Sequence, residues 1–321
     1  MGRRLERRER RQPFAEPGSA GRERKAARGV RVTAVVLSWN GREDTLACLE
    51  SLDGVETVVL DNGSTDGSPE AIEERFPVVE LIRAEVNLGF AAGNNVGIRR
   101  ALDRGADWVV LVNNDATAAP DLMDAFVAAA ARHPDAGALA GKVYVDQPRD
   151  VLWFAGGSFE PRLGYSGRVR GAGKRDDGAY DEETDVDWGT GALLAVSRDA
   201  IERVGLLDEE LFAYLEDVDW CLRIRDAGLR VVFVPSARAW HRVSASTGGA
   251  VSTTNIYYHC RNLLAVCERR APLPRGLTGA RRAVIVVTHL LQSLTHPKRR
   301  AAVATVLSAW RDYRRGRMGR R

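Results

Sequence analysis

The sequence lacks the features that mark secreted, disulfide-stabilised and membrane-spanning proteins. Its four cysteines form no CxxC pair in 321 residues, which is typical of reduced thiols in a cytosolic protein. No apolar segment follows the N-terminal arginines, so no signal peptide is predicted. The longest apolar run near the C-terminus, residues 283–291, is too short to span a bilayer. There is no GxGxxG or Walker sequence, which weakens a dinucleotide-binding or P-loop interpretation.

Positive charge is concentrated at the two ends of the chain. Residues 1–30 hold ten Arg and Lys against four Glu, and residues 269–321 hold fourteen against Asp312 alone. The remaining residues, 31–268, are therefore acidic although the whole chain has a net charge of +4. Because the basic residues lie outside the patterned region, no nucleic-acid partner is predicted. Basic ends fit contact with anionic lipid headgroups, and solvated ends are the alternative.

The apolar pattern predicts an α/β fold. Apolar runs without alternation indicate buried strands over 32–37, 55–60, 78–83 and 108–112. Helices separate them over 42–52 and 69–75, and the Gly- and Asn-rich segment 87–95 opens a third helix that runs to Arg104. A helix over 121–132, a helix over 198–204 and a strand over 230–234 follow. This order describes a mostly parallel sheet flanked by helices, and such sheets bind ligands at the carboxyl ends of their strands.

Two of the predicted strands end in residues suited to a metal site. Asp115 closes the strand over 108–112, and Asn113 and Asn114 beside it supply neutral oxygens and donors. Mg²⁺ or Mn²⁺ takes one or two carboxylates together with diphosphate oxygens. His241, at the end of a later strand, would add a nitrogen ligand. An ordinary turn after a strand explains the Asn-Asn-Asp cluster equally well.

A second acidic cluster lies at the expected start of a helix. Glu216, Asp217 and Asp219 repel one another when packed together, which raises at least one pKa and makes a general base. Helix capping is the alternative.

Further upstream, Trp39 could stack on a base, and Asp61 and Asn62 suit the polar edge of a pyrimidine. Gly89 and Gly93 allow a ligand to approach the backbone closely. A buried core Trp is the ordinary alternative for Trp39.

Taken in this order, the clusters resemble the family 2 glycosyltransferases of the GT-A fold. Within that family, they resemble the rhamnosyltransferase-like branch. The resemblance rests on motifs that together span about residues 31–262. They are Val-Leu-Ser-Trp-Asn (36–40), Leu-Asp-Asn-Gly-Ser-Thr-Asp-Gly-Ser (60–68), Asn-Leu-Gly-Phe-Ala-Ala-Gly-Asn-Asn (87–95), Leu-Val-Asn-Asn-Asp-Ala (111–116), Gly-Thr-Gly-Ala (189–192), Glu-Asp-Val-Asp-Trp-Cys-Leu-Arg (216–223) and Trp-His (240–241).

The resemblance implies a role for each matching residue. Asp217 is the catalytic base, with Glu216 positioning it or the acceptor. Asp115 matches the last acid of a DxD-like metal motif, in which Asn113 replaces the first Asp, and His241 matches a metal-binding histidine. The nucleotide-sugar site is expected to comprise Ser38, Trp39, Asn40, Asp61, Asn62, Asn87, Gly89, Asn94, Asn113, Asn114, Thr190 and Gly191.

The expected organisation is a disordered basic tail (1–29), a GT-A catalytic domain (30–268) and a basic amphipathic helical extension (269–321). The implied reaction is inverting transfer of rhamnose or another hexose from a nucleotide diphosphate sugar to a hydroxyl of a glycan or lipid-linked acceptor, with Mg²⁺ or Mn²⁺. A nucleotidyltransferase and a non-catalytic nucleotide-sugar-binding module are the alternatives. Two locations stay open, the cytoplasm and the inner face of the cell membrane. The extension could contact lipid, pack on the catalytic domain or form a homodimer.

Overall fold

The computed structural model describes residues 29–160, 165–242 and 252–321. Residues 1–28, for which a disordered tail is predicted, lie outside this part. The main sheet has the strand order β10-β12-β6-β11-β4-β1-β2-β3, with β5 paired to β12 and β7 to β6. Its strands are β1 (Val32–Ser38), β2 (Thr57–Asp61), β3 (Glu80–Arg83), β4 (Trp108–Asn113), β5 (Ala116–Ala118), β6 (Ala136–Val145), β7 (Leu152–Phe154), β10 (Thr184–Asp185), β11 (Leu193–Ser197) and β12 (Arg230–His241).

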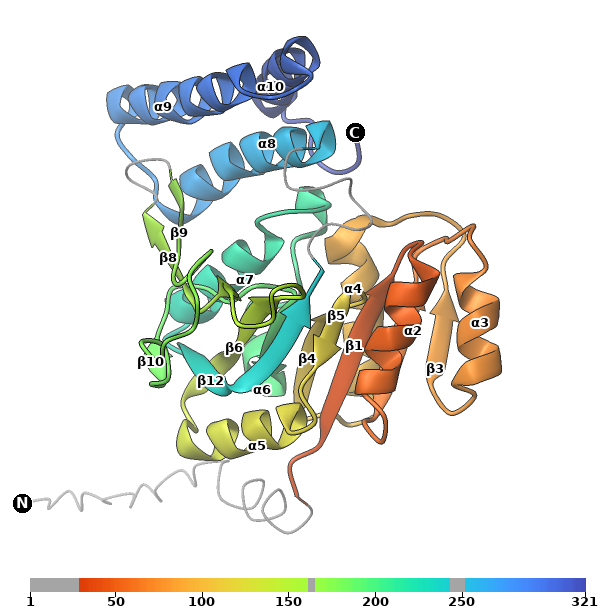
Figure 1. The fold of residues 1–321 in the computed structure, drawn as a ribbon. Helices are drawn as coiled ribbons and strands as arrows, with labels where there is room; N and C mark the ends of the chain where they lie inside the picture. The colour runs from red at the N-terminus through yellow and green to blue at the C-terminus, as the bar shows by residue number, and fades with distance from the viewer. Residues whose placement is uncertain (1–28, 161–164, 243–251) are drawn as a thin grey trace, which may run out of the picture.

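Helices cover this sheet and extend beyond one end of it (Figure 1). They are α2 (Arg42–Ser51), α3 (Ser68–Arg75), α4 (Gly89–Asp103), α5 (Leu122–Arg132), α6 (Arg198–Val204), α7 (Glu216–Asp226), α8 (Thr253–Arg270), α9 (Arg275–Leu294) and α10 (Arg299–Arg314). Strands β8 (Gly157–Glu160) and β9 (Tyr165–Val169) form a separate two-stranded sheet. The predicted α/β fold with a mostly parallel sheet is confirmed.

The order of the parallel strands explains where a ligand can bind. The chain runs outward from β1 through β2 to β3 and then returns across both to β4, and all four are parallel. Right-handed crossovers place α2 and α3 on one face of the sheet and α4 on the other. The order in which the chain adds strands to the sheet therefore reverses between β1 and β4. The carboxyl ends of these two strands open into a crevice.

Helix α4 packs closely on the sheet through two of its three glycines. A Cβ on Gly93 would lie 2.5 Å from Leu37 Cδ1, and a Cβ on Gly97 would lie 2.5 Å from Val35 Cγ1. Any larger residue would push the helix away from β1. This contact fixes the N-terminal end of α4 beside the crevice.

The other half of the sheet is more irregular than the sequence suggested. Strand β11 is antiparallel to both β4 and β6, whereas β12 is parallel to β6. The strand predicted over 230–234 continues to His241, with a change of register between Val234 and Arg238. This continuation pairs with β5 and brings His241 opposite Ala116, directly after β4.

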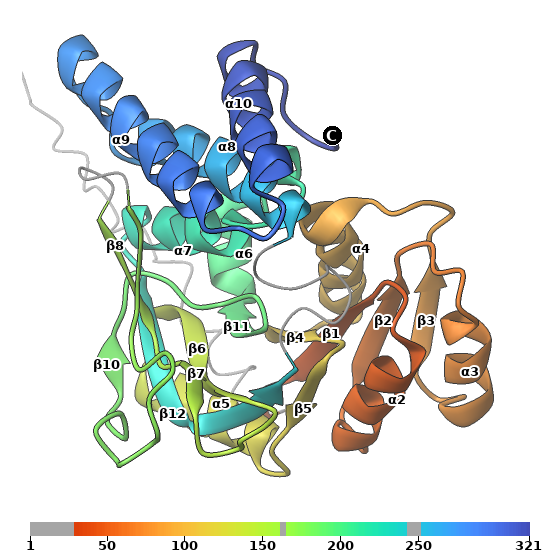
Figure 2. The same cartoon turned by 45° about the horizontal axis from the view of Figure 1, so that its top comes forward.

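Helices α8, α9 and α10 pack together beyond the carboxyl ends of the parallel strands (Figures 1 and 2). Tyr257, Leu263, Ile285, Val306 and Ala309 contribute to their shared buried cluster. The boundary expected at 268/269 falls within the last turn of α8. In the part of the chain that the structure describes, no helix is both long enough and apolar enough to cross a membrane.

Candidate active site

A cleft of about 910 Å³ opens at the carboxyl ends of β1 and β4, between the sheet and α8. It brings together most of the residues that the sequence predicted. Those on its wall are Trp39, Asn62, Asn87, Gly89, Asn113, Asn114, Asp115, Thr190, Gly191, Glu216, Asp217 and His241. Asp115 and Asp217, more than a hundred positions apart in the chain, therefore face the same cavity.

Asp115 and His241 form a pair on one side of the cleft. His241 Nε2 lies 2.8 Å from Asp115 Oδ1, and both side chains are less than a tenth exposed. The backbone holds this pair, because Arg242 N donates to Asp115 O at 2.9 Å and the β5–β12 ladder ends at His241. The Asn113 amide nitrogen lies 3.4 Å from the same imidazole nitrogen.

This pair fits a divalent cation that shares its coordination with a substrate. Within the described ranges, no cluster of three or more His, Cys, Asp or Glu side chains could enclose a metal ion. One carboxylate and one imidazole leave the other positions to diphosphate oxygens and water, an arrangement that Mg²⁺ or Mn²⁺ accepts. A closed structural metal site is excluded for the described residues.

Across the cleft, Glu216 and Asp217 occupy the first turn of α7. The Asp217 carboxylate is oriented by two backbone donors, since Gly191 N donates to Oδ2 at 2.9 Å and Val218 N donates to Oδ1 at 2.8 Å. Burial raises the pKa of Asp217, and these hydrogen bonds counteract the rise by stabilising the charged form. The two backbone donors thus hold the Asp217 side chain in one orientation.

Glu216 is the more strongly perturbed member of this pair. Its Oε2 is buried without a hydrogen-bond partner among the described residues. Burial, followed by the charges of Asp217 and Asp219, raises the pKa of Glu216 well above its ordinary value. When the pair holds one proton, that proton belongs on Glu216, and Asp217 is the member able to accept another.

Asp219, the third acid of the cluster, has a structural role. It is fully buried, and its two oxygens accept hydrogen bonds from Arg223 Nε at 2.8 Å and Arg270 Nε at 2.7 Å. Because Arg270 lies on α8, this ion pair joins α7 to the helical layer. The repulsion inferred from the sequence is therefore partly offset by two arginines.

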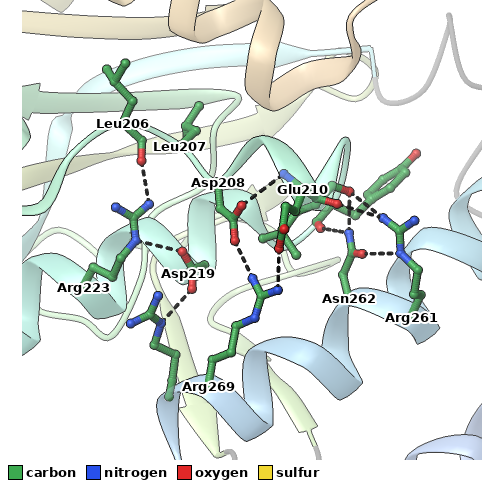
Figure 3. Close-up of polar contacts among 12 residues, drawn as sticks. Leu206, Leu207, Asp208, Glu210, Asp219, Arg223, Arg261, Asn262 and Arg269 are labelled. Carbon is green, nitrogen blue, oxygen red and sulfur yellow. Dashed lines mark hydrogen bonds and ion pairs between the residues drawn. The ribbon is translucent and has the colours of Figure 1, made fainter. Parts of the chain in front are cut away.

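The segment before Glu216 has an unfavourable backbone. Phe212, Tyr214 and Leu215 have φ values of 64°, 68° and 70°, in the left-handed region that favours glycine. Helix α8 holds the neighbouring carbonyls, because Asn262 Nδ2 donates to the carbonyl oxygens of residues 211, 213 and 214 at 2.8, 2.9 and 2.7 Å. Figure 3 shows Asn262 on α8 beside the segment that contains Glu210.

Arg261 extends this contact of α8 with the same segment. Its guanidinium donates to Leu211 O at 3.1 Å and to Glu210 O at 3.3 Å. Further along α8, Arg269 pairs with Asp208 and Glu210 (Figure 3). Helix α8 therefore fixes the loop that leads into the catalytic candidates.

The same loop reaches the N-terminal end of α4. Phe212 O accepts a hydrogen bond from Phe90 N at 2.6 Å. Gly89 has a φ of 88°, and a Cβ there would lie 2.5 Å from the Phe212 ring. Glycine is thus required at position 89 by the backbone conformation and by this close contact. The contact joins the N-terminal end of α4 to the loop before α7.

Several predicted nucleotide-binding residues organise the loops of the site. Asn62 Nδ2 donates to Asn87 Oδ1 at 3.2 Å and to Gly89 O at 3.1 Å, and its Oδ1 accepts from Leu88 N at 2.8 Å. Asn114 Nδ2 donates to Thr45 Oγ1 at 2.9 Å. These amides shape the cleft wall, and Trp39 is the aromatic ring at the end of β1 on that wall.

Four predicted residues lie behind the wall instead of on it. Ser38 is fully buried with its Oγ 3.1 Å from Thr45 Oγ1, and Asn94 Nδ2 donates to Phe90 O within α4. Asn40 Oδ1 accepts from Thr65 N at 3.0 Å. Asp61 Oδ2 accepts from Ser64 N at 3.1 Å. The structure thus gives all four supporting contacts, and direct nucleotide contact by them stays a prediction.

A large part of the cleft wall was not predicted from the sequence. Trp153, Trp188, Tyr257 and Tyr258 line the cleft, as does Arg320 from the far end of the chain. Trp153 packs edge-on against His241, with ring centroids 4.6 Å apart. Except for Trp188, which directly precedes the Gly-Thr-Gly-Ala motif, these residues adjoin no predicted motif, and they reach the cleft only through folding.

Comparison with known proteins identifies this arrangement. Residues 33–203, slightly more than half of the chain, match the family model described as glycosyl transferase family 2. The chain belongs to this family. The sequence left three functions open, and membership of this family shows that the protein is a glycosyltransferase.

Relatives of this glycosyltransferase support the branch as well as the family. It is 33% identical to N-acetylglucosaminyl-diphospho-decaprenol L-rhamnosyltransferase of Mycobacterium tuberculosis over 77% of its own length and 87% of that protein's. It is 25% identical to the dTDP-rhamnosyl transferase RfbF of Shigella flexneri over 80% and 86% of the two chains. The rhamnosyltransferase-like resemblance is therefore confirmed.

The fold of this glycosyltransferase is also found in solved structures. The mannosyltransferase PcManGT from Pyrobaculum calidifontis, in complex with GDP-Man and Mn²⁺, superposes with a TM-score of 0.52 at 20% identity. The match covers 89% of this chain and 76% of that one. This likeness confirms the GT-A fold.

Proposed function

We propose that this glycosyltransferase transfers an L-rhamnosyl residue from a thymidine diphosphate donor to a hydroxyl of a diphosphate-linked lipid acceptor in cell-wall or surface glycan assembly. The names of the mycobacterial and Shigella relatives support the sugar, the nucleotide and the acceptor class. The observation that carries the mechanism is that one cleft holds the Asp115–His241 pair and the oriented Asp217 carboxylate.

In the proposed reaction, Asp217 acts as the general base. The acceptor oxygen attacks the anomeric carbon while Asp217 takes its proton, and the bond from that carbon to the phosphate oxygen breaks with its electron pair leaving on the diphosphate. The single displacement inverts the anomeric configuration. Burial raises the pKa of Glu216 well above its ordinary value, and a proton held there would keep a second negative charge away from the base.

The donor would lie along the wall from Trp39 to Asp115. Trp39 would stack on the base, and Asn87 and Asn114, on the same wall, would contact the ribose and phosphates. Asp115 and His241 would hold a divalent cation, whose chemistry is to offset negative charge on the departing diphosphate. The GT-A neighbour with GDP-Man and Mn²⁺ supports this assignment.

Helix α9 supports a peripheral contact with the inner face of the cell membrane. Its exposed side carries apolar residues spaced by seven, three, four and three positions, which places them on one helix face. This α9 stripe, between 45% and 60% exposed, comprises Leu277, Val284, Val287, Leu291 and Leu294. Fourteen Arg and Lys against one Asp in residues 269–321 complement anionic lipid. Residues 269–321 would then act as the membrane-facing extension of the catalytic domain.

A donor screen tests the proposed function. Purified protein with Mn²⁺ or Mg²⁺ is offered thymidine diphosphate rhamnose, UDP-glucose, UDP-galactose and GDP-mannose, together with a lipid-linked N-acetylglucosaminyl diphosphate acceptor. We expect acceptor-dependent release of thymidine diphosphate, and its loss on chelation with EDTA. Preference for another donor overturns the rhamnose assignment, and full activity in EDTA overturns the metal assignment.

A further inference from the structure

The cleft has very little fixed positive charge of its own. Among the described residues on its wall, the only Arg or Lys side chains are Arg320 and Arg321. Asp115, Glu216 and Asp217 on the same wall are all acidic. Without these two arginines, a diphosphate substrate bound there would meet three acids and no permanent cation on the described wall.

The segment that carries these arginines is held in a defined position. After α10 the chain turns back toward the cleft, and Gly319 N donates to Glu210 O at 2.6 Å. Arg261 Nη1 of α8 donates to Gly319 O at 2.6 Å, so both sides of this residue are hydrogen-bonded. Figures 1 and 2 show the end of the chain next to α8. The contacts of Arg261 thus join this segment to the loop before α7.

The two arginine side chains are held near the cleft without being neutralised. Arg320 Nη1 donates to Asn87 O at 3.4 Å, and the Arg321 guanidinium lies 4.6 Å from the centre of the Tyr257 ring. Arg321 N also donates to the Tyr258 hydroxyl at 3.0 Å. Neither guanidinium pairs with a carboxylate in the described ranges, and both side chains are exposed. Most of their N–H donors therefore remain available to a ligand.

We propose that Arg320 and Arg321 bind the diphosphate group of a substrate in the cleft. This inference rests on the proposed function. The guanidinium fork matches the geometry of phosphate oxygens and forms charge-assisted hydrogen bonds. A divalent cation on Asp115 offsets only part of the charge of a diphosphate. The diphosphates of the donor and of the lipid acceptor share this chemistry, and both must enter the same cleft.

Calorimetric titration of the full-length protein distinguishes binding of the donor diphosphate from binding of the lipid acceptor's diphosphate. Thymidine 5′-diphosphate serves as the donor probe, farnesyl diphosphate as the lipid probe, and thymidine as the phosphate-free control. The double variant Arg320→Ala/Arg321→Ala is compared with Arg314→Ala/Arg315→Ala, which removes the same charge from exposed positions outside the cleft.

We expect the cleft variant to bind at least one diphosphate probe about 10–100-fold more weakly, while thymidine binding and the matched variant stay unchanged. Wild-type affinity should fall more steeply with salt than that of the cleft variant. A loss confined to thymidine diphosphate assigns the pair to the donor, and a loss confined to farnesyl diphosphate assigns it to the acceptor.

Equal binding by both double variants overturns this proposal alone. A wild-type protein that binds neither probe overturns the proposed function with it. Partial recovery by Arg320→Lys/Arg321→Lys supports a charge contact, because lysine keeps the cation without the planar fork.

Discussion

Replacing Asn262 by alanine tests whether α8 positions the catalytic base. Asn262 is fully buried and donates to three carbonyls of the loop that contains Phe212, Tyr214 and Leu215. Left-handed backbone at each of these residues costs about 1–3 kcal/mol. The native loop therefore persists only because surrounding contacts such as those of Asn262 hold it.

The magnitude follows from the hydrogen bonds that are lost. At about 1 kcal/mol net for each bond, and more where a buried carbonyl is left unpaired, Asn262→Ala should favour loop opening by about 2–4 kcal/mol. A displacement of the base by about 1 Å costs on the order of 100-fold in rate. We therefore expect kcat to fall by about 10–100-fold, with little change in the KM for the donor, since Trp39 and Asp115 lie elsewhere on the wall.

Initial rates of nucleoside diphosphate release give kcat and KM, and hydrogen exchange of residues 208–217 reports loop opening. The control is Ser293→Ala, which removes a buried hydrogen bond of α9 that is remote from this loop. Faster exchange confined to the loop together with the kcat loss supports the positioning role. If Asn262→Ala changes kcat no more than Ser293→Ala does, the reasoning is refuted.

Four other predictions concern the acids, the metal pair and the α9 stripe. Asp217→Asn should lower kcat by about 10²–10⁴-fold while calorimetry shows retained donor binding; near-normal turnover would remove Asp217 from the role of base. The base must be ionised and burial raises its pKa above 3.8, so kcat/KM should fall as the pH drops through that raised pKa, and a pH profile flat on the acid side contradicts this. His241→Gln should raise the Mn²⁺ concentration for half-maximal activity by about tenfold or more, and an unchanged metal titration argues against ligation by His241. Leu291→Glu/Leu294→Glu should reduce flotation with phosphatidylglycerol vesicles while activity on a water-soluble acceptor is kept; unchanged flotation refutes the lipid contact, and a wild-type dimer that this variant dissociates assigns the stripe to a second copy.

Local patterns were sufficient for the parallel half of the fold. The apolar runs over 32–37 and 108–112 became β1 and β4 because unalternated Val and Leu suit strands buried on both faces. The acids were found in the same way, since Asp115 and Asp217 directly follow or begin regular elements. The rule for the carboxyl ends of parallel strands places Asp115 at the cleft, whereas Asp217, in the first turn of α7, was assigned to the same site only through the family resemblance.

The support for these residues could not be read from local patterns. Asn262 looks like any polar residue of an amphipathic helix, and its three acceptors lie about fifty positions earlier in the chain. Arg320 contacts Asn87 across 233 positions. From the sequence, Asp219 resembled a member of the active site, but in the structure two partly buried arginines pair with it. Periodicity describes which face of an element is apolar, and it does not describe which distant element covers that face.

The sequence by itself determined the parallel half of the sheet, the family and the two acids, because these depend on residues close together in the chain. Only the tertiary structure decided which groups surround those acids. Burial and the backbone donors of Gly191 and Val218 set the difference between Glu216 and Asp217. The return of residues 316–321 to the cleft supplies its fixed cations. Electric charge, burial and hydrogen bonding act through space, so they are set only once the chain has folded.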